Sequence, residues 1–409
     1  MAALDWRHTG RFAAAAFLMD FASGMLLVPL PYLALKLGAD SMQLGVLGAA
    51  RGCTYMVACF LVALVVDRWN RKAPIACGVT VAAAAMAVMG LAREPWHLYA
   101  FIMLWAAALA FFWPSVLAWI GDSHPAPHLA RATAVVNVSW SIGIMAGGVA
   151  GGCLFQAAPV VVGRLLGAGG AGAGGVQRTA WVLSFAASAV PAVLAAGVLL
   201  VGVPRGRAAP VPPTAASPRP GSRRGLIAAW IGNIGTCSLL GVLENVFPKL
   251  GETPELGIKA GLFGVLMASL ALGRTFVFAA GLGRGAWVRD WRVVGVLQLA
   301  AAALIASVAA TSAFWWLLIV FAGVGVAAGA AYYMALYRSL EGEGSRGFKS
   351  GLHEASLLGG VLLGALGGGY VGKVWHMRAP YPTLGVLCVL LLAGQVALNP
   401  WSDRAGARG

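Results

Sequence analysis

Long apolar runs alternate with short polar segments along the whole chain. An apolar run of about 20 residues spans a bilayer as an α-helix, and we place helix ends where charges, Gly or Pro interrupt a run. The first six helices are expected near residues 12–36, 41–66, 73–92, 97–121, 132–155 and 180–203. The next six are expected near residues 226–250, 258–282, 293–312, 314–340, 350–373 and 380–399. The pattern therefore predicts an all-α membrane protein with twelve transmembrane helices.

A segment rich in proline and arginine separates the two sets of helices. Val203 to Gly225 reads VPRGRAAPVPPTAASPRPGSRRG, with six prolines, five arginines and no acidic residue. This composition indicates a linker rather than a folded element. We therefore predict an N-terminal six-helix bundle over residues 1–203, a linker over 204–225 and a C-terminal six-helix bundle over 226–409.

Composition supports the membrane assignment and excludes other classes. Hydrophobic residues make up 60% of the 409 positions and charged residues only 11%, which is typical of polytopic membrane proteins. The formal net charge of +15 does not indicate nucleic-acid binding, because Lys and Arg are scattered over short loops. The six cysteines lie within or at the ends of apolar runs without a Cys-x-x-Cys pair, so neither a disulfide nor a metal site is expected.

The distribution of Lys and Arg predicts the orientation in the membrane. Of the 29 such residues, nineteen fall on the side of the N-terminus, linker and C-terminus, and eight fall on the opposite side. Because positively charged loops stay in the cytoplasm, we expect a multi-pass protein of the cytoplasmic membrane. Both termini and the linker should be cytoplasmic.

The two halves repeat each other in sequence. NVSWSIGIMAGGVAGG, from Asn137, and EASLLGGVLLGALGGG, from Glu354, align at an offset of 217 with their glycines superposed. An offset of 213 aligns the first and seventh helices and pairs Asp20 with Asn233, and LGVLGA in the second helix resembles FGVLMA in the eighth. Duplication of a six-helix unit into two pseudo-symmetric bundles is a transporter architecture.

Four charged residues crowd into the segment LVVDRWNRKAP between the second and third helices, namely Asp67, Arg68, Arg71 and Lys72. The segment resembles the conserved loop of the major facilitator superfamily, in which Gly, three residues, Asp-Arg, any residue, Gly and basic residues follow one another. Ala63 and Asn70 stand at the two glycine positions, and Asn tolerates a left-handed turn. The resemblance covers essentially the whole chain and implies the major facilitator fold.

The glycine run of the fifth helix is similar to the antiporter signature of that superfamily, Gly-x-x-x-Gly-Pro-x-x-Gly-Gly. Gly143, Gly147, Gly151 and Gly152 fit the signature, whereas Gly148 stands where it has proline. The fourth helix lacks the arginine that is typical of proton-coupled drug exporters. The resemblance favours export over uptake.

Asp67 ends the second helix, and we expect its carboxylate to meet the N-terminus of the eleventh helix, where unpaired N–H groups and the helix dipole favour an anion. The resemblance implies that this latch forms when the cytoplasmic side is closed. Arg71 is expected to pair with Asp122 at the end of the fourth helix. Alternatively, Arg68 and Lys72 only mark the cytoplasmic side.

Ionisable side chains also lie within the predicted spans, namely Asp20, Arg51, Glu244, Arg274, His353 and Glu354. Each is costly in hydrocarbon and should face a partner, a cavity or the bundle interior. Asp20, opposite the uncharged Asn233 in the repeat, is interpreted as a proton or substrate site. The alternative is a structural carboxylate that is hydrogen-bonded between helices.

The other charges leave several roles open. Glu354, beside His353, is a second candidate for proton coupling or a carboxylate favoured by the helix dipole. Arg51 and Arg274 are expected to pair with an acid or to bind an anionic substrate. Glu244 lies close to the outer surface and is either part of the site or in water.

The resemblance implies that the first, fourth, seventh and tenth helices surround a central cavity. Six residues are expected to line it, namely Phe112, Trp113, Asn137, Trp140, Tyr332 and Tyr333. Aromatic surfaces suit apolar or aromatic solutes. The alternative is that these side chains only pack the helices together.

These features predict a secondary active transporter that moves a small organic solute outward by alternating access, coupled to protons. A proton-coupled uptake symporter is the alternative. A membrane enzyme or a non-transporting sensor is a further alternative, but His353 and Glu354 form no nucleophile–base or metal constellation with neighbours. No Gly-x-x-x-x-Gly-Lys-Ser/Thr loop occurs, which argues against ATP hydrolysis by the chain. We expect a monomer without cofactors.

Overall fold

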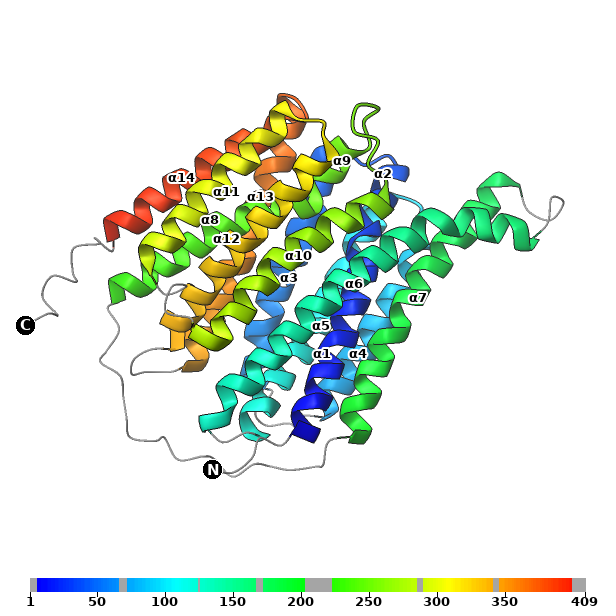
Figure 1. Cartoon of the computed structure of the whole chain (residues 1–409). Coiled ribbons are helices and arrows are strands. Elements are labelled where there is room, and N and C mark those ends of the chain that lie inside the picture. Colours follow the sequence, from blue (N-terminus) through cyan, green and yellow to red (C-terminus); the bar gives the residue numbers. More distant parts are fainter. Residues whose placement is uncertain are drawn as a thin grey trace, which may run out of the picture.

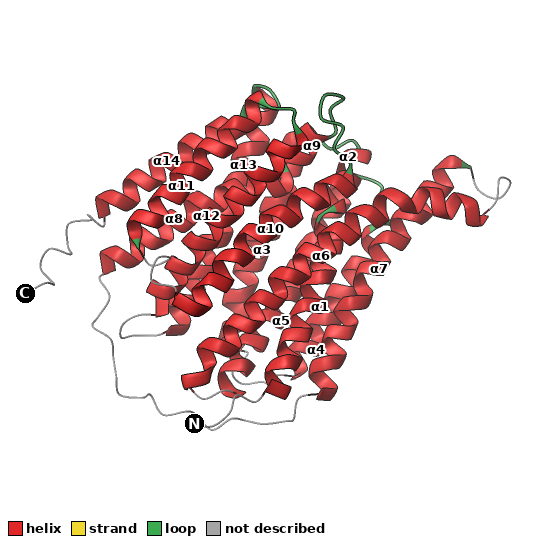
Figure 2. Ribbon diagram, in the orientation of Figure 1, coloured by secondary structure: helices red, strands yellow, loops and turns green. Residues whose placement is uncertain are grey.

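The computed structural model is a bundle of helices that run roughly side by side (Figure 1, Figure 2). It describes residues 6–65, 72–123, 126–166, 172–202, 223–284, 290–340 and 346–398. Within these ranges no strand occurs, and twelve segments are long and apolar enough to cross a membrane. The predicted all-α fold with twelve spans is confirmed.

We call α1 to α7 the N-terminal half. It consists of α1 (Trp6–Leu27), α2 (Pro29–Lys36), α3 (Ser41–Val65), α4 (Lys72–Met89), α5 (Pro95–Ser123), α6 (Ala126–Leu166) and α7 (Ala173–Gly202). We call α8 to α14 the C-terminal half. It consists of α8 (Arg223–Asn245), α9 (Phe247–Gly251), α10 (Ala260–Arg284), α11 (Trp291–Ser307), the short 3-10 helix η3 (Val308–Ala310), α12 (Phe314–Leu340), α13 (Arg346–Val374) and α14 (Pro380–Leu398).

The first span of each half is broken near its end. α1 gives way to α2 at Val28, and α8 gives way to α9 at Val246. Pro29 and Pro248 follow these breaks, and proline has no N–H to continue the helical hydrogen bonds. The end of the bundle that carries α2 and α9 is called the α2 end below (Figure 1).

α6 and α7 are longer than the sequence pattern predicts. The expected spans end at residue 155 and start at residue 180, but α6 continues to Leu166 and α7 begins at Ala173. α6 passes through Pro159 without ending, so proline did not mark a boundary here. The two extensions project beyond the rest of the bundle at the α2 end (Figure 1).

Glycines bring α6 against α1 in the N-terminal half and α13 against α8 in the C-terminal half. In the N-terminal half, a Cβ added at Gly147 would collide with the carbonyl of Phe21 in α1. In the C-terminal half, a Cβ added at Gly364 would collide with the carbonyl of Ser238 in α8. Only glycine allows backbones to approach this closely, as small residues do in membrane helix pairs.

The same contacts fix the register of the internal repeat. Three glycines of α6 meet α1 in the pairs Gly143 with Phe17, Gly147 with Phe21 and Gly151 with Met25. Three glycines of α13 meet α8 in the pairs Gly360 with Ile234, Gly364 with Ser238 and Gly368 with Val242. Every residue of the second set lies 217 positions after its counterpart. The offset of 213 inferred for the first and seventh helices is therefore wrong by four residues, and Asp20 corresponds to Cys237 rather than to Asn233.

The contacts between the halves follow the same symmetry. Gly45 of α3 lies against Ala365 of α13, and Gly264 of α10 lies against Gly148 of α6. Gly45 and Gly264 are 219 positions apart, which is the offset of LGVLGA and FGVLMA. Gly38 and Gly257, also 219 apart, both adopt positive φ (90° and 58°) in the turns before these helices, a conformation that favours glycine. α3 and α10 therefore occupy equivalent places.

Hydrogen bonds and ion pairs join the two halves at the α2 end. Tyr32 Oη donates to the carbonyl of Ile258 at 2.9 Å. Lys373 Nζ lies 2.8 Å from Asp40 Oδ2, and Gln156 Oε1 accepts from the backbone N–H of Gly261. The α2 end of the bundle is closed.

Candidate functional site between the two halves

An ion pair crosses the interface between the halves. Arg51 projects from α3 and Glu244 from the end of α8, and Arg51 Nη2 donates to Glu244 Oε2 at 2.8 Å. The side chains retain only 15% and 22% of their exposure. The sequence places both residues in the candidate site but does not predict that they pair. Glu244 is therefore not simply in water.

Arg274 projects from α10 toward the N-terminal half. Its guanidinium lies over the ring of Trp140 in α6, with Cζ 4.5 Å from the ring centroid. It interacts electrostatically with Glu244 and with Asp20. Its Nε is buried and makes no hydrogen bond within the described part of the chain. Arg274 therefore combines a cation–π contact with unused hydrogen-bonding capacity.

Asp20 lies in α1 and is almost fully buried, with 9% of its surface exposed. Its carboxylate lies within electrostatic reach of Arg274, and the hydroxyl of Ser23, one turn of α1 away, donates to the carbonyl of Met19 at 2.9 Å. α1 belongs to the N-terminal half and α10 to the C-terminal half. A charge on Asp20 in the N-terminal half therefore attracts Arg274 in the C-terminal half.

Tyr55 is a residue that sequence reasoning missed. It lies in α3, is partly buried, and has Asp20, Glu354 and Cys59 within electrostatic reach. Tyr55 corresponds to Arg274 at the offset of 219 that relates α3 to α10. This correspondence is the signal that would have found it.

A row of rings runs from Trp140 in the N-terminal half, beneath Arg274, into the C-terminal half. Ring centroids are 5.9 Å apart for Trp140 and Phe278, 5.6 Å for Phe278 and Tyr332, and 4.7 Å for Tyr332 and His353. His353 has no exposed surface, and neither of its ring nitrogens has a hydrogen-bond partner among the described residues. Glu354, next to it, keeps some exposed surface. The side chains of Trp140, Phe278, Tyr332 and His353 are called the ring row below.

The two amides of the predicted site have partners in the structure. Asn233 Nδ2 donates to Ser356 Oγ at 2.9 Å, which links α8 to α13. Asn233 is fully buried, which is typical of a packing role. Asn137 Oδ1 accepts from the indole N–H of Trp140 at 3.2 Å and so orients the ring beneath Arg274.

The remaining aromatic residues differ in their exposure. Phe112 is fully buried in the hydrophobic core of the N-terminal half, edge to face with Trp113. Trp113, Tyr332 and Tyr333 keep some exposed surface. A place in the cavity wall stays a prediction for these three, whereas Phe112 packs helices.

Most of the predicted cytoplasmic gate falls outside the described residues. Asp67, Arg68 and Arg71 lie in the stretch 66–71, and the structure does not describe the side chain of Asp122. Lys72 is described, and its Nζ donates to the carbonyl of Leu200 in α7 at 2.6 Å. Lys72 thus binds within its own half, and the Asp67 latch stays a prediction.

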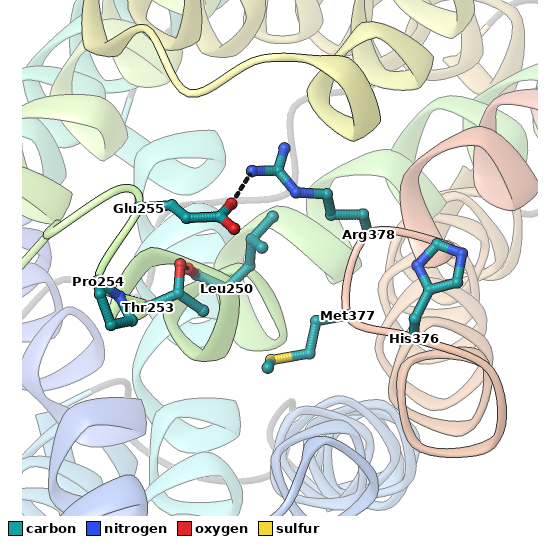
Figure 3. Close-up of a pocket in the computed structure, with 7 residues that line it drawn as sticks. All are labelled: Leu250, Thr253, Pro254, Glu255, His376, Met377 and Arg378. Atoms are coloured by element: carbon teal, nitrogen blue, oxygen red, sulfur yellow. Dashed lines mark hydrogen bonds and ion pairs between the residues drawn. The ribbon is translucent and has the colours of Figure 1, made fainter.

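A peripheral pocket of about 440 Å³ opens at the α2 end (Figure 3). The loop after α9 and the turn between α13 and α14 form its walls, and Arg378 Nη2 lies 2.7 Å from Glu255 Oε2 across it. Arg378 Nη1 also donates to the carbonyl of Thr311. The intramembrane charges described above are not among its lining residues. The pocket is therefore separate from the candidate site.

Charged residues outside the spans also attract the two halves to each other at the α2 end. Burial raises the pKa of Asp40, but hydrogen bonds from Lys373 and from the backbone N–H groups of Gln43 and Met42 outweigh this effect and hold the pKa below its ordinary value. Burial raises the pKa of Glu252, although Lys36 and Lys249 act in the opposite direction. Lys36 belongs to α2 and Glu252 follows α9, so this attraction too joins the halves.

Comparison with known proteins identifies the family to which the sequence is similar. The sequence model described as Major Facilitator Superfamily matches residues 12–337. Among proteins with curated descriptions, none matches the chain.

Several solved structures share the fold. A bacterial homolog of the human lysosomal transporter Spinster, in an inward-facing and occupied conformation, has a TM-score of 0.73 and 17% identity over 97% of each chain. The nucleoside transporter NupG has a TM-score of 0.68 and 12% identity over 97% of this chain and 100% of its own. A POT family transporter in complex with a thioalcohol-conjugated peptide has a TM-score of 0.72 and 11% identity over 96% of each chain.

Proposed function

The chain belongs to the major facilitator superfamily and is a multi-pass membrane transporter, and from this premise we propose that it moves a small organic solute by proton-coupled alternating access. Export is the proposed direction. The chain works as a monomer in the cytoplasmic membrane, with both termini and the linker in the cytoplasm. The two halves, with boundaries at residues 203 and 226, rock about the site between them.

One observation carries the proposal, namely the position of Asp20 at the interface within electrostatic reach of Arg274. An ionisable carboxyl inside a membrane is costly and typically marks a proton or substrate pathway. Adding a proton to Asp20 removes an attraction between the two halves. Proton binding thereby changes the relative free energies of two conformations, which is the requirement for coupling. Glu354 is the second candidate for this role.

The closed α2 end agrees with the proposed orientation. If that end faces away from the cytoplasm, as the distribution of Lys and Arg predicts, the structure corresponds to an inward-facing state. The Asp67 latch is then expected to be open in this state and to form when the cytoplasmic side closes.

A second candidate function is uptake by proton symport. Asp20 and an anionic solute would compete for the positive charge of Arg274. A proton on Asp20 then favours anion binding, and by linkage the anion favours the proton. Such mutual stabilisation is typical of symport, whereas the glycine signature of α6 favours export.

Flux measurements in proteoliposomes test the proposal. Solutes that stabilise the purified protein in a thermal-shift screen are loaded, and a pH gradient of either sign is imposed between about pH 6 and 8. We expect the gradient to accelerate transport of the wild type, and its sign to separate antiport from symport. Asp20→Asn should lose the acceleration but keep solute exchange without a gradient.

The matched control is Cys237→Ala, which changes the equivalent position of the other half. It should keep gradient-driven flux. Undiminished acceleration in Asp20→Asn would remove Asp20 from the mechanism and make Glu354→Gln the next variant to test.

A further inference from the structure

Arg51 and Arg274 lie well inside membrane spans, and their partners in the structure differ. Arg51 donates to a carboxylate at 2.8 Å. Arg274 has no carboxylate within 4.0 Å in the part of the chain that the structure describes, and its buried Nε has no hydrogen-bond partner there. A partly buried guanidinium without a hydrogen-bonded acid is unusual because burying a charge is costly unless it is paired. Arg274 therefore keeps hydrogen-bonding capacity that the described chain does not use.

The residues around Arg274 fix the position of its guanidinium, but none of them binds it as a hydrogen-bonded anion. Trp140 supplies a ring face at 4.5 Å, and the hydrogen bond to Asn137 fixes that ring. Glu244 and Asp20 attract Arg274 from a greater distance, but Glu244 is already bound to Arg51. The guanidinium is thus positioned in advance, and pre-ordering of this kind reduces the cost of binding a ligand.

The ring row supplies an apolar surface beside the charge. Trp140 and Tyr332 retain some exposed surface, and Phe278 lies between them. His353 closes the row with two unpartnered ring nitrogens. The row crosses the interface, because Trp140 belongs to α6 and the other three residues to the C-terminal half. A solute that contacts the row therefore touches both halves, as a transported solute must.

We infer that Arg274 receives the carboxylate of an organic anion whose aromatic or apolar body lies against the exposed part of the ring row, at Trp140 and Tyr332. The inference rests on the proposed transport of a small organic solute and names its class. Because the anion competes with Asp20 for Arg274, it accords with the second candidate function, symport, rather than with export. A guanidinium binds a carboxylate through two parallel hydrogen bonds, and ring faces bind apolar bodies.

Matched acids and amides test this inference. The purified full chain is titrated at neutral pH with phenylacetate, 1-naphthylacetate and octanoate, and separately with the corresponding amides, while thermal unfolding is followed by light scattering. We expect saturable stabilisation by at least one acid and much weaker stabilisation by its amide. Arg274→Gln should weaken binding of that acid roughly ten- to hundredfold, because a hydrogen bond to a charged group is worth about 1.5–3 kcal/mol.

Further variants keep the test decisive if Arg274→Gln does not fold. Arg274→Lys keeps the charge but loses the planar fork, so it should bind the acid less tightly than the wild type and more tightly than Arg274→Gln. Trp140→Leu should weaken the aromatic acids more than octanoate. Asp20→Asn removes a competing negative charge and should bind the acid at least as tightly as the wild type. Lys373→Gln, which removes a cation at the α2 end away from Arg274, should keep the preference for the acid over its amide.

The inference is overturned if none of the acids stabilises the wild type more than its amide, or if the folded Arg274 variants keep the preference. The binding assay uses no gradient, so its failure leaves proton-coupled transport of another solute class standing. Conversely, loss of gradient-driven flux with intact acid binding would count against coupling alone.

Discussion

The N-terminal and C-terminal halves share a backbone framework but differ in their charges. The glycines of α6 and α13 make equivalent contacts with α1 and α8, and α3 and α10 start after equivalent glycines at positive φ. At the interface, however, each of these ionisable side chains corresponds in the repeat to an uncharged one in the other half. Asp20 corresponds to Cys237, Arg51 to Leu270, Arg274 to Tyr55, Glu244 to Leu27 and Glu354 to Asn137.

This difference separates what the fold requires from what transport requires. Two backbones in contact leave no room for a side chain, so these positions must be glycine in both halves. The charges are not needed for packing, since the equivalent half packs without them. Their asymmetric placement gives one set of attractions across the interface instead of two, as expected if a single site serves both halves.

The largest expected effect comes from breaking the shared framework. Gly147→Val and Gly364→Val each place a side chain against a backbone carbonyl of the first helix of its half. Overpacking of a core costs about 1–3 kcal/mol, and a backbone cannot yield as a side chain can. We expect both variants to lose at least about 3 kcal/mol and to yield little folded protein by size exclusion and thermal unfolding.

Gly197→Val and Gly367→Val are the matched controls, because a Cβ at either position meets nothing within 4 Å. They should stay within about 1 kcal/mol of the wild type, close to the difference in helix propensity. If Gly147→Val were tolerated and Gly364→Val were not, the framework would not be equivalent in the two halves.

A smaller effect is expected from the interface charges. Glu244→Gln leaves Arg51 without its carboxylate. Breaking a buried pair costs about 3–5 kcal/mol, and partial exposure of both side chains reduces this to roughly 1–3 kcal/mol. Because the pair joins α3 to α8 while the α2 end is closed, the variant should shift the population toward states in which that end is open. Each 1.4 kcal/mol changes the ratio of states about tenfold.

Spin-label distances across the α2 end measure this shift. Labels at Glu94→Cys and Trp375→Cys, in a background without the native cysteines, report the separation of the halves. Arg51→Glu combined with Glu244→Arg should restore part of the closed population. Glu255→Gln breaks a pair within the C-terminal half alone and should leave the distances unchanged. Equal shifts in Glu244→Gln and Glu255→Gln would show that the Arg51 pair does not hold the halves together.

Sequence patterns predicted the helices well and the contacts between them poorly. Hydropathy located twelve spans because each apolar run must cover a membrane. The register of α1 and α8 was misjudged because KLG recurs at an offset of 213, whereas packing follows the glycines at 217. A shift of four residues is about one helical turn and keeps the same face, so the error did not disturb the hydrophobic pattern.

The partners of the charges lay beyond the reach of sequence patterns. Arg51 and Glu244 are 193 residues apart, and only the docking of the two halves brings them together. Tyr55 looked like an ordinary aromatic residue of an apolar helix until its correspondence to Arg274 was known. The extended end of α6 was missed because Pro159 resembles a helix end and is not one.

The smallest expected effect concerns Asp40, where the halves differ by a helix cap. Asp40 Oδ1 accepts from the backbone N–H of Gln43, whose side chain accepts from the N–H of Asp40, which forms a reciprocal capping arrangement. The equivalent position before α10 is Lys259, which cannot cap in this way. Asp40 also pairs with Lys373, but their side chains are 41% and 55% exposed, so the pair contributes at most about 1 kcal/mol.

Asp40→Asn and Asp40→Ala separate the two contributions. Asn keeps a good cap and loses only the ion pair, so we expect a loss of less than about 1 kcal/mol that disappears in 1 M salt. Ala also loses the cap and should cost about 1 kcal/mol more. Because the pKa of Asp40 is lowered in the folded protein, its contribution is complete above the ordinary value of 3.8 and is lost only as the pH falls below it. The difference between wild type and Asp40→Asn should therefore be constant from about pH 5 to 8 in thermal unfolding, and a difference that grew with pH over this range would mean that another group titrates in place of Asp40.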